Sequence, residues 1–133
     1  MKVYLGRRYR FSASHRLHSD AFDAQQNREI YGKCNNPHGH GHNYTVDVLL
    51  SGQVDGHGMV CDLAELDEFA KRELVDRFDL TNLNVDCAFE NLVPTTENLS
   101  KEIFRIFRTG FSGARVERIR VEETQNNFFE YAE

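Results

Sequence analysis

The sequence is poor in several residue types, and each scarcity narrows the class of protein. It contains no tryptophan, two prolines and three cysteines in 133 residues. An odd number of cysteines, with no Cys-x-x-Cys motif, argues against a disulfide framework and favours a reducing cytoplasm. No apolar run approaches the roughly 20 residues of a membrane span, and the N-terminal residues lack the apolar segment of a signal peptide. We therefore expect a cytoplasmic protein that does not enter a membrane.

The balance of charge excludes a second group of partners. Sixteen basic residues are set against twenty-one acidic ones, which gives a formal net charge of −5. A general binder of nucleic acid or of anionic lipid needs the opposite sign. Hydrophobic residues make up 40% of the chain and include ten phenylalanines. This is enough for one modest core, so we expect a single domain over residues 1–133.

Hydrophobic periodicity predicts the order of the secondary structure elements. Segments in which apolar and polar residues alternate are predicted as strands, and segments with a 3.6-residue period as helices. The expected elements are a strand over 2–14, a loop over 16–33 with a short helix near 21–31, a hairpin of strands over about 42–54 and 59–61, helices over about 62–77 and 94–110, and a final strand pair over about 118–123 and 128–131.

This order indicates an α+β fold in which two consecutive helices cover one face of an antiparallel sheet. Asp62 and Glu65 have the spacing of a capping box at the start of the first of these helices. A sheet this small leaves exposed edges, and pairing with other chains is one way to cover them.

Three histidines are predicted to lie on one face of the sheet. His40 and His42 are two residues apart, with the same parity as the apolar residues of their strand, and His15 continues the apolar parity of the first strand. Three imidazoles with a fourth position left open are typical of catalytic zinc. Two alternatives stay open: Cys34 is a fourth ligand that makes the zinc purely structural, or His38 replaces one of the three.

Cys34 and Glu123 are the other candidate functional residues. A free cysteine beside a divalent cation has a lowered pKa, so Cys34 could act as a thiolate base or nucleophile. Glu123 places a carboxylate on the apolar face of its strand, which is costly unless that group has a partner. The alternative is that Glu123 lies at the end of the strand and is solvated.

Five collinear segments resemble the 6-pyruvoyl-tetrahydropterin synthase family over nearly the whole chain. The gap of five residues between Cys34 and His40 is similar to the biopterin branch, whereas the related 6-carboxy-tetrahydropterin synthases usually have a shorter gap. The segments are Phe11-Ser12-Ala13-Ser14-His15-Arg16-Leu17, Gly32-Lys33-Cys34-Asn35-Asn36-Pro37-x-Gly39-His40-Gly41-His42-Asn43-Tyr44, Gly58-Met59-Val60, Thr95-Thr96-Glu97-Asn98 and Glu123-Thr124-x-Asn126-Asn127.

The resemblance implies a fold and an assembly. The fold would be the T-fold, an antiparallel four-stranded sheet with two helices on one face. Three copies would close a β-barrel through their edge strands, and two trimers would stack into a homo-hexamer.

The resemblance also implies the ligands and their residues. These are zinc on His15, His40 and His42; a pterin anchored by Glu123, with Thr95, Thr96 and Glu97 lining its pocket from a neighbouring subunit; and proton transfer by Cys34, with Asp79 as a member of its relay.

The implied activity is that of a carbon–oxygen lyase acting on phosphates, in tetrahydrobiopterin biosynthesis. It would convert 7,8-dihydroneopterin triphosphate to 6-pyruvoyl-tetrahydropterin and eliminate triphosphate without an external redox cofactor. Zinc would act as a Lewis acid, and Mg²⁺ could accompany the triphosphate. Arg16, Arg28 and Lys33 are candidates to meet the charge of that triphosphate.

One position departs from the family. Members of the family follow the relay aspartate with a histidine, but here Asp79 is followed by Leu80. Leucine can neither donate nor accept a proton, so His38, His57 or water would take its place, or the chemistry would be slower or different. The alternatives are a 6-carboxy-tetrahydropterin synthase, another enzyme that cleaves the pterin side chain, and a non-enzymatic pterin-binding relative.

Overall fold

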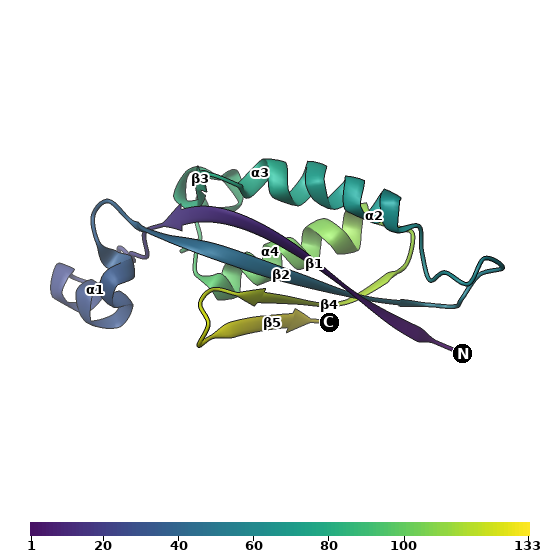
Figure 1. Ribbon diagram of the computed structural model, residues 1–133. Helices are drawn as coiled ribbons and strands as arrows, with labels where there is room; N and C mark the ends of the chain where they lie inside the picture. Colours follow the sequence, from purple (N-terminus) through teal and green to yellow (C-terminus); the bar gives the residue numbers. More distant parts are fainter.

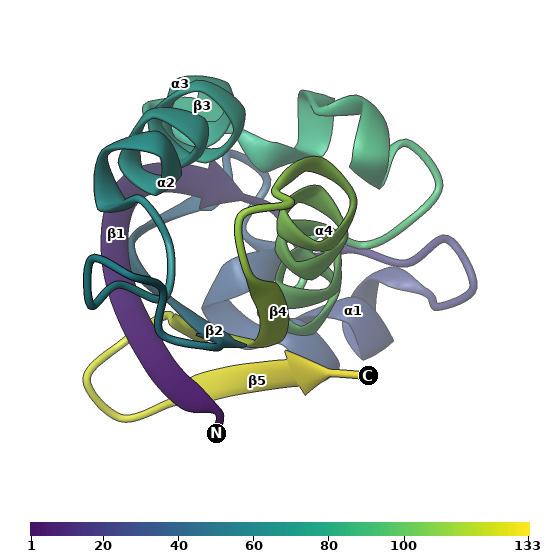
Figure 2. The same cartoon turned by 90° about the vertical axis from the view of Figure 1, so that its right-hand side faces the viewer.

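The protein is described by a computed structural model that covers all residues from Met1 to Glu133. A curved sheet forms one layer and a pair of helices covers one of its faces (Figures 1 and 2). The elements are β1 (Val3–His15), α1 (Ala24–Tyr31), a 3₁₀ turn (Gly32–Asn35), β2 (His40–Gly52), α2 (Leu63–Ala70), a π-helical turn (Lys71–Val75), α3 (Asp76–Phe78), β3 (Thr81–Asn82), 3₁₀ turns (Leu83–Val85 and Cys87–Phe89), α4 (Thr96–Gly110), β4 (Arg115–Glu122) and β5 (Phe128–Ala132).

The sheet has five strands in the order β3-β1-β2-β4-β5. Three of its pairings are antiparallel, but β3 runs parallel to β1, with Ala13 opposite Thr81. The expectation of four antiparallel strands is therefore wrong in number and in direction, although the α+β class is right. β3 has only two residues, so it has no periodicity for a pattern to detect. It is held by the backbone N–H of Leu80, which donates to Ser12 O at 2.6 Å.

The predicted hairpin between β2 and residues 59–61 is also wrong. β2 lies between β1 and β4, so both of its edges are already paired. Residues 53–61 instead form a loop that is closed by a hydrogen bond from Asp55 N–H to Met59 O at 2.9 Å. The Asp55 carboxylate accepts the N–H groups of His57 and Met59 within this loop.

The first long helix begins at the predicted cap, and the second begins within two residues of its predicted start. Asp62 accepts the N–H groups of Ala64 and Glu65, and α2 continues through the π-helical turn and α3 to Phe78. Thr95 caps α4 by accepting the N–H of Asn98 at 3.2 Å. Both predicted helices are thus confirmed. The long loop does hold a short helix, α1, and that helix carries the reciprocal capping box that was expected at Asp62.

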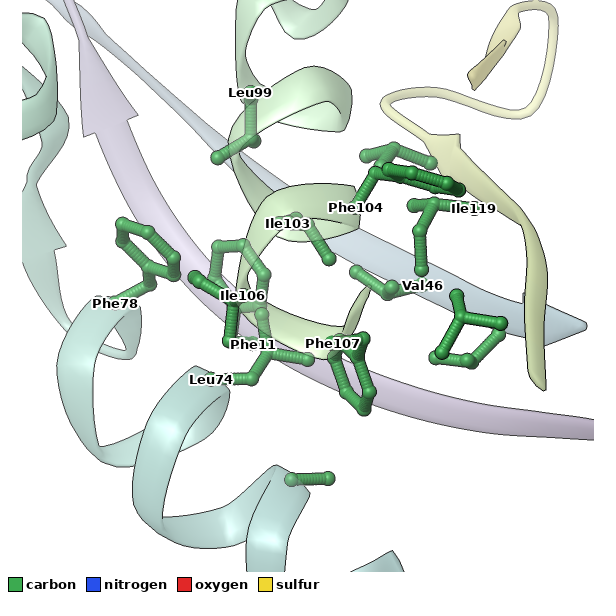
Figure 3. Close-up of a cluster of buried hydrophobic side chains, with 14 of the residues drawn as sticks. Phe11, Val46, Leu74, Phe78, Leu99, Ile103, Phe104, Ile106, Phe107 and Ile119 are labelled. Carbon is green, nitrogen blue, oxygen red and sulfur yellow. The ribbon is translucent and has the colours of Figure 1, made fainter. Parts of the chain in front are cut away.

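The core lies between the sheet and the two long helical segments. Side chains from α4, from the α2–α3 segment and from the three central strands meet there (Figure 3). Phe11, Val46 and Ile119 contribute from the strands, and all three are buried as their parity predicts. The opposite face of the sheet carries charged pairs such as Arg8 with Asp47. None of the helices has both the length and the apolar character that a membrane crossing needs.

Because Phe107 on α4 is fully buried and packs against Tyr9 and Phe69, Phe107→Ala should destabilise the fold by about 3–5 kcal/mol. Val85→Ala is the control, since Val85 is 80% exposed and its truncation should change stability by less than about 0.5 kcal/mol. Urea denaturation of both variants measures the difference. Equal losses would contradict the placement of α4 over the sheet.

Candidate functional site

The register of β1 and β2 brings the three predicted histidines to one place. His15 is the direct partner of His40, and Ala13 is the direct partner of His42. Partners in an antiparallel pair share a face, so the three imidazoles project on the side of the core. The rings of His15 and His42 are 4.9 Å apart, and those of His40 and His42 are 4.6 Å apart. His15 is fully buried, whereas His40 is exposed.

Two further segments add a thiol and a carboxylate. The potential metal-ligating atoms of His15, Cys34, His42 and Glu123 all lie within 4.8 Å of one another. Cys34 is held there because its carbonyl accepts the N–H of Leu17 at 2.7 Å, just after β1 ends. Glu123 directly follows β4, the neighbour of β2 in the sheet. Its Oε1 lies 3.0 Å from His42 Nε2 and 3.7 Å from His15 Nε2.

A hydrogen bond sets the orientation of the His15 ring. His15 Nδ1 lies 2.8 Å from the carbonyl oxygen of Pro94, at the start of α4. A carbonyl can only accept, so Nδ1 carries the proton and the neutral ring directs the Nε2 lone pair at the group. The Nε2 atoms of both His15 and His42 are buried without a hydrogen-bond partner. Burying two nitrogens without hydrogen-bond partners costs free energy. A cation bound between these nitrogens and the Glu123 carboxylate removes that cost.

The protonation states also suit a metal. Burial lowers the pKa of His15 and of His42, which favours the neutral imidazole that ligates metals. Burial, together with the charge of Glu123, raises the pKa of the Cys34 thiol. The lowered pKa expected for Cys34 therefore depends on a bound cation to offset both effects. Imidazole, thiolate and carboxylate donors in this number suit zinc.

The structure brings most, though not all, of the predicted ligands into one group. His15 and His42 belong to it; His40 packs against His42 but its nitrogens lie outside it. Cys34 and Glu123 take part instead, so a set that includes Cys34 stays open beside the set of three histidines. His38 is exposed, and His57 lies in the loop beyond the opposite end of β2.

The predicted substrate residues lie at the start of α4. Thr95 is the N-cap of the helix, and Glu97 is exposed in its first turn. Thr96 is only 2% exposed, and its hydroxyl has no hydrogen-bond partner. Sequence reasoning missed Tyr44, whose hydroxyl lies 3.4 Å from His15 Nδ1. Tyr44 is two residues from His42 on the same strand, so the alternating pattern already predicted that both side chains share a face.

The predicted relay residue Asp79 and the divergent Leu80 lie beside β1 and outside the group of four. The Asp79 carboxylate accepts the N–H of Ser12 at 2.8 Å. Leu80 is 84% exposed and has a positive φ of 58°, a conformation that is uncommon for a residue with a side chain. Within one chain, neither residue belongs to the histidine, cysteine and carboxylate group.

This α+β sheet, with a half-buried imidazole, thiol and carboxylate group at one end, defines a protein with a candidate metal site. Comparison with known proteins identifies its family. A family model described as 6-pyruvoyl tetrahydropterin synthase matches residues 4–133. The 6-pyruvoyl tetrahydrobiopterin synthase of Homo sapiens is 39% identical over 132 residues, which cover 98% of this chain and 91% of that protein. That of Drosophila melanogaster is 40% identical, with 97% and 79% covered.

The solved structures agree with the sequences. The structure of Caenorhabditis elegans 6-pyruvoyl tetrahydropterin synthase matches with a TM-score of 0.93 at 39% identity, and the match covers 100% of this chain and 96% of that one. The chain therefore belongs to the 6-pyruvoyl tetrahydropterin synthase family, and the resemblance found in its motifs is confirmed.

Zinc should stabilise this protein, because it satisfies the buried nitrogens of His15 and His42. At a free zinc concentration of 100 times Kd, the gain is about 2.7 kcal/mol. A thermal shift on adding zinc to chelator-treated protein measures it. His15→Ala and His42→Ala should abolish the shift, and Cys34→Ala should keep it. Loss of the shift in Cys34→Ala would instead make Cys34 a ligand and contradict an open metal site.

Proposed function

We propose that this protein is a zinc-dependent lyase that converts 7,8-dihydroneopterin triphosphate to 6-pyruvoyl-tetrahydropterin and releases triphosphate. The observation that carries the proposal is the group of His15, Cys34, His42 and Glu123, in a chain about 40% identical to named 6-pyruvoyl tetrahydrobiopterin synthases. These residues supply a metal site, a proton-transfer group and an anchor for a heterocycle within a few ångströms. The proposed localisation is cytoplasmic, and no nucleic acid or membrane partner is proposed.

Glu123 is the proposed anchor of the pterin. Its side chain is 12% exposed, so a ligand can reach it, while Asn127 Nδ2 donates to its Oε2 at 3.2 Å and holds it in place. An ionised carboxylate accepts two parallel hydrogen bonds, which matches the 2-amino group and adjacent ring N–H of a pterin. Thr95, Thr96 and Glu97 are proposed to line the pterin pocket. Their place at the start of α4, next to the Pro94 carbonyl that contacts His15 Nδ1, supports this role.

Zinc is proposed to bind His15, His40 and His42. The exposed His40 ring is free to turn toward the metal, since no hydrogen bond restrains it, and its strand position is fixed opposite His15. When bound, the ion supplies Lewis acidity that makes the C–H bonds beside the side-chain hydroxyls easier to break. Mg²⁺ is proposed as a companion of the substrate triphosphate.

Cys34 is the proposed proton carrier. As a thiolate it takes a proton from the substrate side chain and returns it to the pterin ring, so that the ring is reduced as the side chain is oxidised. Both changes occur within one molecule, which is why no external redox cofactor is needed. The nearby Glu123 charge opposes ionisation of the thiol, so this role depends on the positive charge of the metal.

The site is proposed to be completed by other copies of the chain in a homo-hexamer of two trimers, joined as a β-barrel in the T-fold manner. β3 and β5 are the two edges of the sheet, and each has one side free for another strand. Asp79 is the proposed relay partner of Cys34. It is not part of the group in its own chain, so the proposal places the Asp79 of one copy near the Cys34 of another.

The product of the reaction tests this function. Zinc-loaded protein incubated with 7,8-dihydroneopterin triphosphate should release triphosphate and form a pterin with a three-carbon side chain, identified by mass spectrometry. Cys34→Ala should lower the rate by about 10²–10⁴-fold or more while zinc stays bound. A shortened side chain would point to a 6-carboxy-tetrahydropterin synthase or another side-chain-cleaving enzyme. Unchanged substrate would point to a pterin-binding relative.

Leu80→His tests the departure from the family. If the missing acid–base group limits the rate, the variant should gain activity, up to the roughly 10²–10⁴-fold expected of a positioned acid or base. Leu80→Phe is the matched control, since it adds a ring that cannot exchange protons. No gain in Leu80→His would mean that another group already serves as the relay.

A further inference from the structure

We propose that Tyr44 is a positioning residue, whose hydroxyl holds the ring of His15 in the orientation that a zinc ion needs. Tyr44 lies on β2, two residues beyond His42, on the face of the sheet that carries the core. This inference rests on the proposed zinc site and adds to it a residue outside the group of ligand atoms. Tyr44 acts through His15 and does not itself touch the ion.

The pairing of β1 with β2 brings Tyr44 to the histidines. Phe11 is the direct partner of Tyr44, and His15 follows on the same strand with the same parity. The Tyr44 ring lies 5.6 Å from the His42 ring and 6.4 Å from the His15 ring, edge-on in both cases. It also stacks against Phe11 at 5.2 Å. The phenol is thus held between the core and the candidate metal site.

Packing explains the ring of Tyr44 but not its hydroxyl. The residue is 1% exposed, and a phenylalanine would fill the same space. A hydroxyl taken out of water costs free energy unless it has a hydrogen-bond partner. The partner that the structure gives it is Nδ1 of His15, at 3.4 Å. The reason for a buried hydroxyl at this position therefore lies with His15.

The direction of these hydrogen bonds follows from the two oxygens beside His15. Nδ1 lies 2.8 Å from the carbonyl oxygen of Pro94, so this nitrogen carries the proton. The oxygen of Tyr44 then accepts a share of the same proton, as in other three-centre hydrogen bonds. A ring held from two sides cannot turn about its Cβ–Cγ bond without losing both contacts. The Nε2 atom of His15 therefore stays directed at the group.

This arrangement also strengthens the lone pair that would bind the metal. Groups that accept from the far N–H of a ligating histidine fix the ring and raise its basicity, and their removal typically weakens metal binding by about 10–100-fold. Burial, followed by the charge of Glu123, raises the pKa of Tyr44 above its usual range. The phenol is therefore neutral, and it orients His15 without competing for the cation.

The phenolic hydrogen needs an acceptor, and Thr96 in the first turn of α4 is the nearest candidate. Thr96 is 2% exposed, and no other group satisfies its hydroxyl. Burial raises the pKa of Tyr44, whereas a contact with the Thr96 hydroxyl lowers it, so the two hydroxyls are neighbours. A chain of polar groups thus runs from Thr96 through Tyr44 to His15.

The affinity for zinc, measured by competition with a chelator, tests the inference. Tyr44→Phe keeps the ring and removes the hydroxyl, and it should weaken zinc binding by about tenfold or more. Tyr9→Phe is the matched control, because the Tyr9 hydroxyl donates to Asp67 at 2.9 Å, outside the metal group. It should change zinc affinity by less than about twofold. Equal affinities in wild type and Tyr44→Phe would overturn the proposal.

The stability of the zinc-free protein separates positioning from a structural role. After treatment with chelator, the urea midpoint of Tyr44→Phe should fall no further than that of Tyr9→Phe, since Tyr9→Phe loses a hydrogen bond to a carboxylate. A loss of zinc affinity that appeared equally in Tyr9→Phe would mean that affinity merely follows stability. That result would also overturn the proposal.

A second variant tests the chain through Thr96. Thr96→Val keeps the shape of the side chain and should weaken zinc binding in the wild-type background. It should add nothing in Tyr44→Phe, because groups that act through one contact are not additive. Equal losses in both backgrounds would contradict a chain through Tyr44.

These measurements also distinguish this inference from the proposed function. A wild-type protein that binds no zinc would end the proposed metal site. Zinc binding that depends on Tyr44, in a protein that does not convert the pterin, would end the proposed reaction and leave the role of Tyr44 standing.

Discussion

The register between β1 and β2 is the constraint on which the rest of the structure depends. These two strands pair over their full length, and the last pair places His15 opposite His40. A slip of one residue would turn the whole apolar set of either strand to the outer face, so burial of Phe11, Tyr44 and Val46 fixes the register. The same burial therefore fixes the histidines. The core and the candidate metal site are specified by one set of contacts.

The helical layer also determines the geometry of the candidate metal site. Packing of α4 on the sheet brings the carbonyl of Pro94 to His15 Nδ1 and thereby decides which nitrogen of that ring faces the site. The other members of the site are Cys34, on the 3₁₀ turn before β2, and Glu123, directly after β4. Residues from three distant regions of the sequence, at 15, 34–42 and 123, thus meet at one end of the sheet. This end is where irregular backbone, free of ladder hydrogen bonds, can bring a thiol and a carboxylate beside two imidazoles.

Electrostatics links the candidate metal site to the thiol of Cys34. Glu123 and the buried histidines leave an uncompensated carboxylate and two unpartnered nitrogens, a combination that favours a cation. Cys34 belongs to the same group, and burial together with the charge of Glu123 raises the pKa of its thiol. The thiolate state that the proposed proton transfer by Cys34 requires therefore depends on a cation bound at the site.

The sequence by itself determined the α+β class, the two long strands, both helix starts and the shared face of His15 and His42, because these follow from local periodicity and capping. The tertiary structure alone decided that β2 is central, which removed the expected hairpin, and that β3 joins as a parallel fifth strand. It also decided that Cys34 and Glu123, rather than His40, complete the closest group of ligand atoms. Strand order, loop paths and side-chain approach depend on contacts between distant segments, and no local pattern records which segments will meet.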